Sequence, residues 1–114
     1  MGQFILFIRD GALPDAPQTP EEMQQSVERY RQWAGALAQQ GKLVSAFKLK
    51  DDGGRLMQSR DGEIAVDGPF TETKETIGGY FVIEAADYAE ATELARACPI
   101  FLGGGVLEVR QIEM

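Results

Sequence analysis

A chain of 114 residues with 44% hydrophobic and 25% charged residues has the composition of one ordinary globular domain, so residues 1–114 are expected to form a single fold. The net charge of -7 argues against nucleic acid and anionic membrane surfaces as partners, because both attract a basic face. The chain has no histidine and one cysteine, which excludes Ser-His-Asp and Cys-His catalysis, histidine-bearing metal sites and an internal disulfide.

The first predicted element is a strand over Gln3–Arg9. Its centre, Phe4-Ile5-Leu6-Phe7-Ile8, is a continuous apolar run rich in aromatic and β-branched residues. Such a run is typical of a strand that is covered on both faces. The segment Asp10–Pro20 contains Gly11 and three prolines and is predicted to be a long loop.

A helix is predicted to begin after Thr19, because Thr19-Pro20-Glu21-Glu22 combines an N-cap, a proline at the first helical position and the glutamate of a capping box. Gly41 is expected to end this helix. Trp33 is expected to pack between helix and sheet. The inward stripe is predicted from residues spaced three and four apart, namely Met23, Val27, Tyr30, Ala34 and Leu37.

A second strand is predicted over Leu43–Leu49, with Leu43 and Phe47 on the same side. Glycine-rich turn signals then bracket a short hairpin, whose strands are Arg55–Gln58 and Glu63–Val66.

Ile77–Ala85 has the pattern of the next strand. The pair Gly78-Gly79 at its entry predicts a bulge or the close approach of another backbone. Asp87-Tyr88-Ala89-Glu90 has the capping signal of a second helix, which Pro99 should end. Cys98, at the end of this helix, is expected to be a small buried thiol.

A last strand over Val106–Ile112 completes the order βαβ–βαβ with an inserted β-hairpin. This order predicts an α+β fold with the ferredoxin-like split sheet, antiparallel, with both helices on one face. Because Phe4–Ile8 is apolar on both faces, we expect a second copy of the chain to cover the other face. The result would be a homodimer joined through the sheet face, a dimeric α/β-barrel-like assembly. The alternative is that the hairpin or the 10–20 loop folds over that face, although both contain few apolar residues.

The segment Asp67-Gly68-Pro69-Phe70-Thr71-Glu72-Thr73-Lys74-Glu75 resembles the signature of the DGPF-type members of the YCII-related family. The resemblance continues through Ile77–Ala85, Asp87–Pro99 and Gly104–Arg110, and it covers nearly the whole chain. It implies a ferredoxin-like dimer. Some members are linked or fused to extracytoplasmic-function sigma factors, which implies a regulatory context. Other members have a proposed His-Asp catalytic pair, which this chain cannot form without histidine.

The charged segment of that signature supplies candidate site residues. Asp67 and Glu72 are candidate catalytic carboxylates, since burial in a cleft would raise the pKa of one of them and make it a general base. Lys74 or Arg110 would hold an anionic substrate. The candidate ligand-binding residues are Arg9, Lys74, Glu75, Tyr80 and Arg110.

Each candidate also has a structural interpretation. Asp67 is equally well explained by a hydrogen bond within its own turn. The charges at Glu72, Lys74 and Glu75 fit an ordinary solvated surface. Glu108 and Arg110, two apart on one strand, are expected to form structural ion pairs, either with each other or across the dimer interface.

The sequence therefore predicts a homodimeric protein that binds an unidentified small molecule, and the resemblance implies a regulatory role linked to a sigma-factor system. The alternative function is a small enzyme that uses carboxylate acid-base chemistry on a small organic acid or carbonyl compound. A third interpretation is a purely structural dimerisation unit. We expect no cofactor, no metal, no nucleic acid and no membrane as partners. A cytoplasmic location is expected, since no apolar run approaches the roughly 20 residues of a membrane span.

Overall fold

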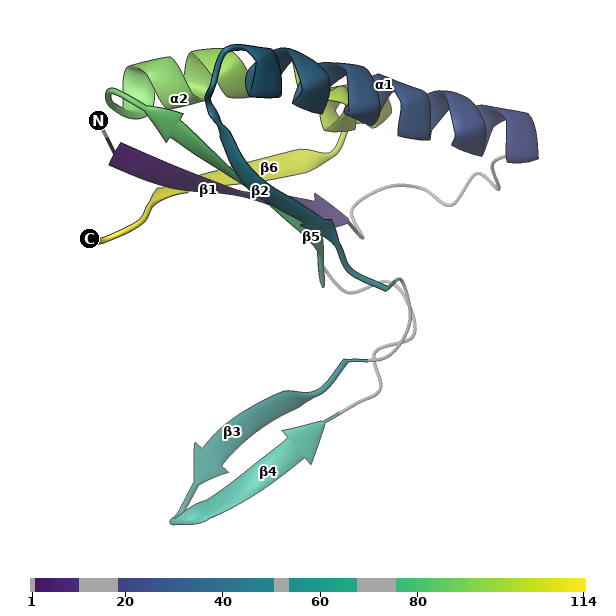
Figure 1. Cartoon of the computed structure of the whole chain (residues 1–114). Helices are drawn as coiled ribbons and strands as arrows, with labels where there is room; N and C mark the ends of the chain where they lie inside the picture. The colour runs from purple at the N-terminus through teal and green to yellow at the C-terminus, as the bar shows by residue number, and fades with distance from the viewer. Residues whose placement is uncertain (1, 11–18, 51–53, 68–75) are drawn as a thin grey trace.

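The computed structural model describes residues 2–10, 19–50, 54–67 and 76–114 (Figure 1). The predicted strands, helices and hairpin are present in the predicted order, and a short 3₁₀ helix lies in the last crossover. The elements are β1 (Gly2–Asp10), α1 (Pro20–Gln39), β2 (Leu43–Lys48), β3 (Leu56–Arg60), β4 (Glu63–Asp67), β5 (Thr76–Ala85), α2 (Tyr88–Ala95), the 3₁₀ helix η1 (Pro99–Gly103) and β6 (Val106–Gln111).

The main sheet has four antiparallel strands in the order β2-β5-β1-β6. Helices α1 and α2 lie on the same side of it (Figure 1). Helix α1 connects β1 with β2, and helix α2 connects β5 with β6. The two strands of each pair are parallel but not neighbours, because one strand of the other pair lies between them in the sheet. This interleaving is the ferredoxin-like split arrangement, which confirms the predicted α+β class.

The core lies between the sheet and the two helices. Alternate residues of the central strands β1 and β5 point toward the helices, and Phe4, Leu6 and Ile83 are completely buried there. Trp33 is also buried, as predicted. Its indole N–H donates to the Leu94 carbonyl oxygen at 3.2 Å, so the polar edge of the ring is satisfied.

Both helices begin where the capping signals predict. The Thr19 hydroxyl oxygen accepts a hydrogen bond from the backbone N–H of Glu22 at 3.1 Å, and the Asp87 carboxylate accepts one from that of Glu90 at 2.9 Å. Gly41, just past the end of α1, adopts a φ of 71°. A residue with a side chain rarely adopts this left-handed conformation, which explains why the helix ends there.

The predicted inward stripe of α1 is wrong in its first half. Met23 and Val27 are both more than half exposed, whereas Leu37 is buried. In Figure 1 the beginning of α1 extends beyond the edge of the sheet. The periodicity correctly marks one face of the helix, but none of the described strands lies beneath its first half.

The prediction that Leu43 and Phe47 share a side of β2 is also wrong. Leu43 lies opposite Ile83 and packs against the core, whereas Phe47 lies opposite Tyr80 on the other face. Between Leu43 and Ser45 the register shifts, and a bulge of this kind reverses the alternation of side chains along a strand.

Both interpretations of Gly78-Gly79 are confirmed. Ile8 pairs with Gly79 but Arg9 pairs with Ile77, so the strand β5 has one extra residue at this point. A Cβ atom on Gly79 would lie 2.9 Å from the carbonyl oxygen of Phe47, which is too close for a residue with a side chain. Glycine is therefore required where β2 and β5 meet.

The strands β3 and β4 form a separate two-stranded sheet. The turn between them is Asp61-Gly62, with φ values of 50° and 82°, which matches the type I′ turn of tight hairpins. Figure 1 shows this hairpin apart from the main sheet, on the side away from the helices. In the described part of the chain, neither helix is long and apolar enough to cross a membrane.

Candidate functional site

The open face of the main sheet, opposite the helices, brings several predicted ligand-binding residues together. Phe47, Tyr80, Phe7 and Glu108 pair in sequence across β2, β5, β1 and β6, so they form one row across this face. Phe7 and Tyr80 are half-buried, and Phe47 is exposed. The row consists of three aromatic rings that end at a carboxylate.

Two arginines converge on that carboxylate. Arg9 Nη1 donates to Glu108 Oε1 at 2.8 Å, and Arg110 Nη1 donates to Glu108 Oε2 at 3.4 Å. The hydrogen bond from Arg9, and then that from Arg110, lower the pKa of Glu108, while its partial burial acts in the opposite direction. Glu108 is therefore ionised at neutral pH. We refer to Arg9, Glu108 and Arg110 as the arginine cluster.

The arginine cluster places two cations beside one carboxylate on this face of a protein whose net charge is -7. Its two cations differ in accessibility, because 31% of the Arg9 side chain is exposed compared with 68% of the Arg110 side chain. A guanidinium has five N–H donors, and the bond from Arg110 to Glu108 uses one of them, on Nη1. Arg110 can therefore donate to an incoming anion while it keeps its bond to Glu108.

The aromatic rings next to the cluster form an apolar surface in which the rings of Phe47 and Tyr80 are tilted to each other. The centroids of Phe47 and Tyr80 are 5.7 Å apart with an interplanar angle of 45°. Phe7 lies between Tyr80 and Glu108 in the row of paired residues. A flat carbon skeleton could pack on these rings with its polar group toward Arg110.

The structure places three predicted ligand-binding residues, Arg9, Tyr80 and Arg110, on this one face. It separates Asp67 from them, because Asp67 is the exposed last residue of β4 in the hairpin. Glu72, Lys74 and Glu75 lie outside the described residues, so their predicted roles stay predictions.

Two features of this face did not come out of the sequence reasoning. The first is the bond between Arg9 and Glu108, which are 99 positions apart and meet only because β1 pairs with β6. The second is the aromatic row, which depends on the bulge that turns Phe47 to this face. The predicted pairing of Glu108 with Arg110 is confirmed, and the spacing of two residues on a strand was its signal.

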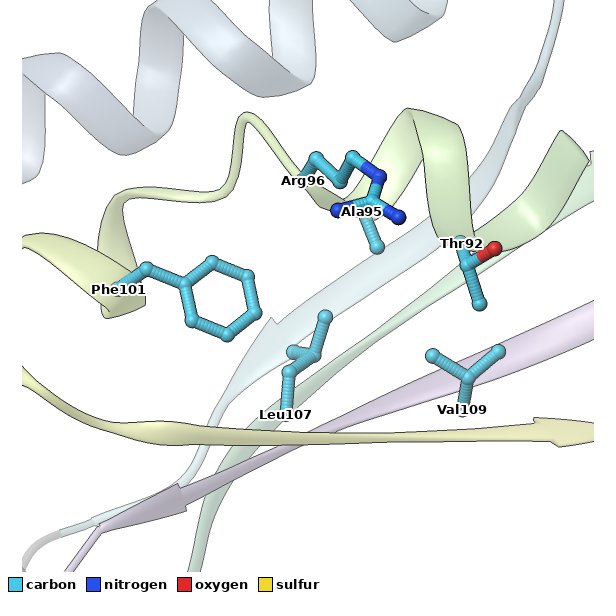
Figure 2. A pocket seen from close by; sticks show the side chains of 6 residues that line it. All are labelled: Thr92, Ala95, Arg96, Phe101, Leu107 and Val109. Carbon is cyan, nitrogen blue, oxygen red and sulfur yellow. The ribbon is translucent and has the colours of Figure 1, made fainter. Parts of the chain in front are cut away.

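A hollow lies on the other side of the sheet, between it and the helices. Figure 2 shows side chains from α2, η1 and β6 around a space of about 230 Å³, namely Thr92, Ala95, Arg96, Phe101, Leu107 and Val109. The Thr92 hydroxyl donates to the carbonyl oxygen of Tyr88 at 2.8 Å, and Arg96 pairs with Glu93 at 3.1 Å. The polar groups thus already have partners within their own helix, and the hollow presents mainly carbon to a ligand.

Cys98 is a buried free thiol, as predicted. Burial raises its pKa to about 11, so the thiol is protonated at neutral pH and is a poor nucleophile. Among the described residues, no group of three or more Cys, Asp or Glu side chains is arranged to hold a metal ion.

Comparison with known proteins gives a family, a relative and a fold. A model of the YCII-related domain matches residues 9–114. An uncharacterised protein of Rhizobium meliloti (strain 1021), R00369, is 35% identical over 71 residues, which are 62% of this chain and 54% of that protein. This chain's match therefore spans about half the length of that relative.

Among solved structures, 5-chloro-2-hydroxyhydroquinone dehydrochlorinase (TftG) from Burkholderia phenoliruptrix AC1100, in complex with 2,5-dihydroxybenzoquinone, is similar with a TM-score of 0.51. The match covers 97% of this chain and 93% of that one, at 14% sequence identity. At this identity the likeness supports the ferredoxin-like fold alone.

Proposed function

The chain belongs to the YCII-related family, and on that premise we propose that it is a dimeric protein that binds a small, flat organic anion on the open face of its sheet. Within the family we place it in the DGPF-type group, because the segment Asp67–Glu75 has that signature. The proposed ligand lies on the aromatic row, with its anionic group at the arginine cluster.

The arginine cluster is the observation that carries this proposal. Arg110 bonds the carboxylate of Glu108 through Nη1 at 3.4 Å, and its exposed guanidinium keeps further N–H donors for a ligand. Arginine suits this role because its planar fork of donors matches the geometry of a carboxylate or an enolate oxygen pair. Arg110, the more exposed of the two, is proposed as the main contact.

The shape of the ligand follows from the rings beside the cluster. Tyr80 and Phe47 offer aromatic faces, which favour a flat partner. The structurally similar dehydrochlorinase was solved with 2,5-dihydroxybenzoquinone, a flat ring with oxygen substituents. That observation concerns the other protein, but it supports the choice of flat, oxygen-bearing compounds as probes for this one.

The proposed dimer covers the same face with a second copy. Phe47, Ile77 and Val106 are each at least 39% exposed there, and the helices occupy only the other side of the sheet. A second sheet against this face would bury these side chains and enclose the arginine cluster. Enclosure would strengthen its attraction for an anion, because charges interact more strongly away from bulk water.

A binding role suits the charge state of the cluster, and the proposed regulatory link to a sigma-factor system comes from the resemblance to the DGPF-type members. The pKa of Glu108 is lowered, so this carboxylate does not serve as a base near neutral pH. The described part of the site is thus suited to hold an anion rather than to remove a proton.

The alternative is an enzyme acting on a small organic acid or carbonyl compound. The fold shared with a dehydrochlorinase favours this possibility. In that case Asp67 or Glu72 would be the base and Arg110 or Lys74 the anchor. Replacement of Glu72 would then abolish turnover without weakening binding, whereas a binding protein would show no turnover of any ligand in the first place.

The proposal is tested with benzoate and its neutral isostere benzamide as probes. A ligand at one hundred times its dissociation constant stabilises the folded state by about 2.7 kcal/mol, which a thermal shift detects. We expect benzoate to raise the melting temperature and benzamide to leave it unchanged. Arg110→Gln should remove the benzoate shift, and the matched control Arg31→Gln, in an exposed i,i+3 pair on α1, should retain it. Equal shifts for both probes, or a full benzoate shift in Arg110→Gln, would overturn the proposal.

A further inference from the structure

The hairpin of β3 and β4 has one face without charge. Residues directly opposite in an antiparallel pair share a face, as do alternate residues of a strand. Met57 pairs with Val66 and Ser59 with Ile64, which gives a face without any ionisable side chain. The opposite face carries the charges, since Arg60 pairs with Glu63 there. We refer to the residues Met57, Ser59, Ile64 and Val66 as the arm face.

The arm face is open to solvent in the single chain. Met57 is 63% exposed, Ile64 68% and Val66 55%. Three large apolar residues on one side of a short ribbon, with charges confined to the other side, are typical of a surface that is buried in the complete assembly. A two-stranded hairpin is only marginally stable by itself in water, so contact with another surface would also stabilise it.

The position of the hairpin indicates which surface that is. Figure 1 shows it on the side of the sheet away from the helices, the side on which the open face looks out. The chain has a radius of gyration of 16.0 Å, compared with about 13 Å for a compact chain of this length. The hairpin therefore projects into the space that a second copy would occupy if it covered the open face.

The area of the open face supports the same conclusion. Four strands of six to ten residues, about 4.8 Å apart, present about 500 Å² in plan, which is less than the roughly 800 Å² per partner of a stable interface. Contact through the arm face would enlarge the interface with apolar surface. In the chain the hairpin follows β2, which is an edge strand of the main sheet.

We infer that the β3–β4 hairpin is a dimerisation arm, which packs its arm face against a second copy of this chain and extends the sheet-to-sheet interface. This inference rests on the proposed pairing through the open face. It assigns the inserted hairpin to assembly, a role separate from ligand binding at the arginine cluster.

The first test compares two lysine variants in the otherwise intact chain by sedimentation equilibrium. Ile64→Lys places a charge in the arm face and should weaken dimerisation by about tenfold or more, because an unpaired charge would be buried. The matched control, Gln58→Lys, adds the same charge to the opposite face of the same hairpin and should change the dissociation constant by less than about twofold. Dimerisation of Ile64→Lys equal to that of the wild type would overturn the arm and leave the sheet-to-sheet dimer standing.

The second test uses the unmodified protein, so that it does not depend on how the variants fold. We expect amide hydrogen exchange in Leu56–Arg60 and Glu63–Asp67 to be slow at concentrations that favour the dimer and fast on dilution. Amides of the central strand β1 should stay protected in both conditions. Protection of the hairpin that does not depend on concentration would contradict the inference. A wild-type chain that is monomeric at every concentration would overturn the arm and the dimer together, whereas loss of the benzoate response alone would affect only the proposed ligand.

Discussion

The replacement Gly79→Ala tests the packing of the sheet at its tightest point. Gly79 lies where β5 passes β2, and a Cβ atom there would lie 2.9 Å from the carbonyl oxygen of Phe47 and 3.4 Å from the Cα atom of Lys48. Both neighbours are backbone atoms of a hydrogen-bonded strand, so neither can turn away as a flexible side chain would. The added methyl must therefore push β2 and β5 apart by a few tenths of an ångström.

The size of the effect follows from two opposing contributions. Inserting a methyl into a well-packed region costs about 1–3 kcal/mol. The same replacement restricts the unfolded chain and returns about 0.4–1 kcal/mol. We expect a net loss of about 1–2 kcal/mol in the free energy of unfolding. Gly35→Ala is the matched control, because nothing lies within 4 Å of its Cβ position on α1. There the change should add about 0.5–1 kcal/mol, since alanine is the better helix former.

Urea denaturation of the wild type and the two variants at one protein concentration measures both changes. The fixed concentration matters because a dimer is stabilised by mass action. The two variants should differ by about 1.5–3 kcal/mol in the free energy of unfolding, with opposite signs relative to the wild type. A Gly79→Ala protein as stable as the wild type would refute the close approach of β2 to β5.

Three further predictions concern the acid stability, the thiol and the core. The pKa of Glu108 in the folded state lies below its ordinary value of 4.5, so its interaction with Arg9 stabilises the protein above that pH, and this stabilisation is lost as the pH falls through the folded-state pKa. The stability difference between the wild type and Glu108→Gln, followed by urea midpoints, should therefore shrink on acidification from about pH 6 to about pH 3. A difference independent of pH would contradict the pairing. Cys98, whose pKa is raised to about 11, should resist a thiol-labelling reagent in the native protein at neutral pH and react fully in denaturant, as mass spectrometry can show; rapid native labelling would be the opposite result. Leu6→Ala should lower the free energy of unfolding by about 2–5 kcal/mol in thermal or urea denaturation, because Leu6 is completely buried. Leu102→Ala, at a position 72% exposed, should stay within about 0.5 kcal/mol of the wild type. Equal effects of the two replacements would place the core elsewhere.

The local signals in the sequence predicted the elements well. The caps at Thr19 and Asp87 depend on hydrogen bonds that span three residues, so a short stretch contains all the required information. The turn at Asp61-Gly62 is similarly local, because its positive φ values suit those two residue types. The apolar run in β1 and the order of the elements were enough to predict the ferredoxin-like fold.

Errors occurred where the outcome depends on distant partners. Phe47 and Leu43 were predicted to share a face, but a bulge against β5 reverses the alternation between them. Met23 has the spacing of a core residue, yet it is exposed because the sheet ends before that part of α1. The pattern along a helix or strand shows which residues can share a face, and it does not show how far the neighbouring surface extends.

The sequence by itself determined the secondary structure and the fold class, because helix caps, tight turns and apolar periodicity act between residues close in the chain. The family came from the resemblance of the segment Asp67–Glu75, and the charged and aromatic residues supplied Arg9, Tyr80 and Arg110 as ligand-binding candidates. Only the tertiary structure decided that Arg9 and Arg110 share the carboxylate of Glu108 and that Asp67 lies apart in the hairpin. The physical reason is the register of β1 against β6. That register is set by how all the strands pack together, and no short stretch of the sequence contains it.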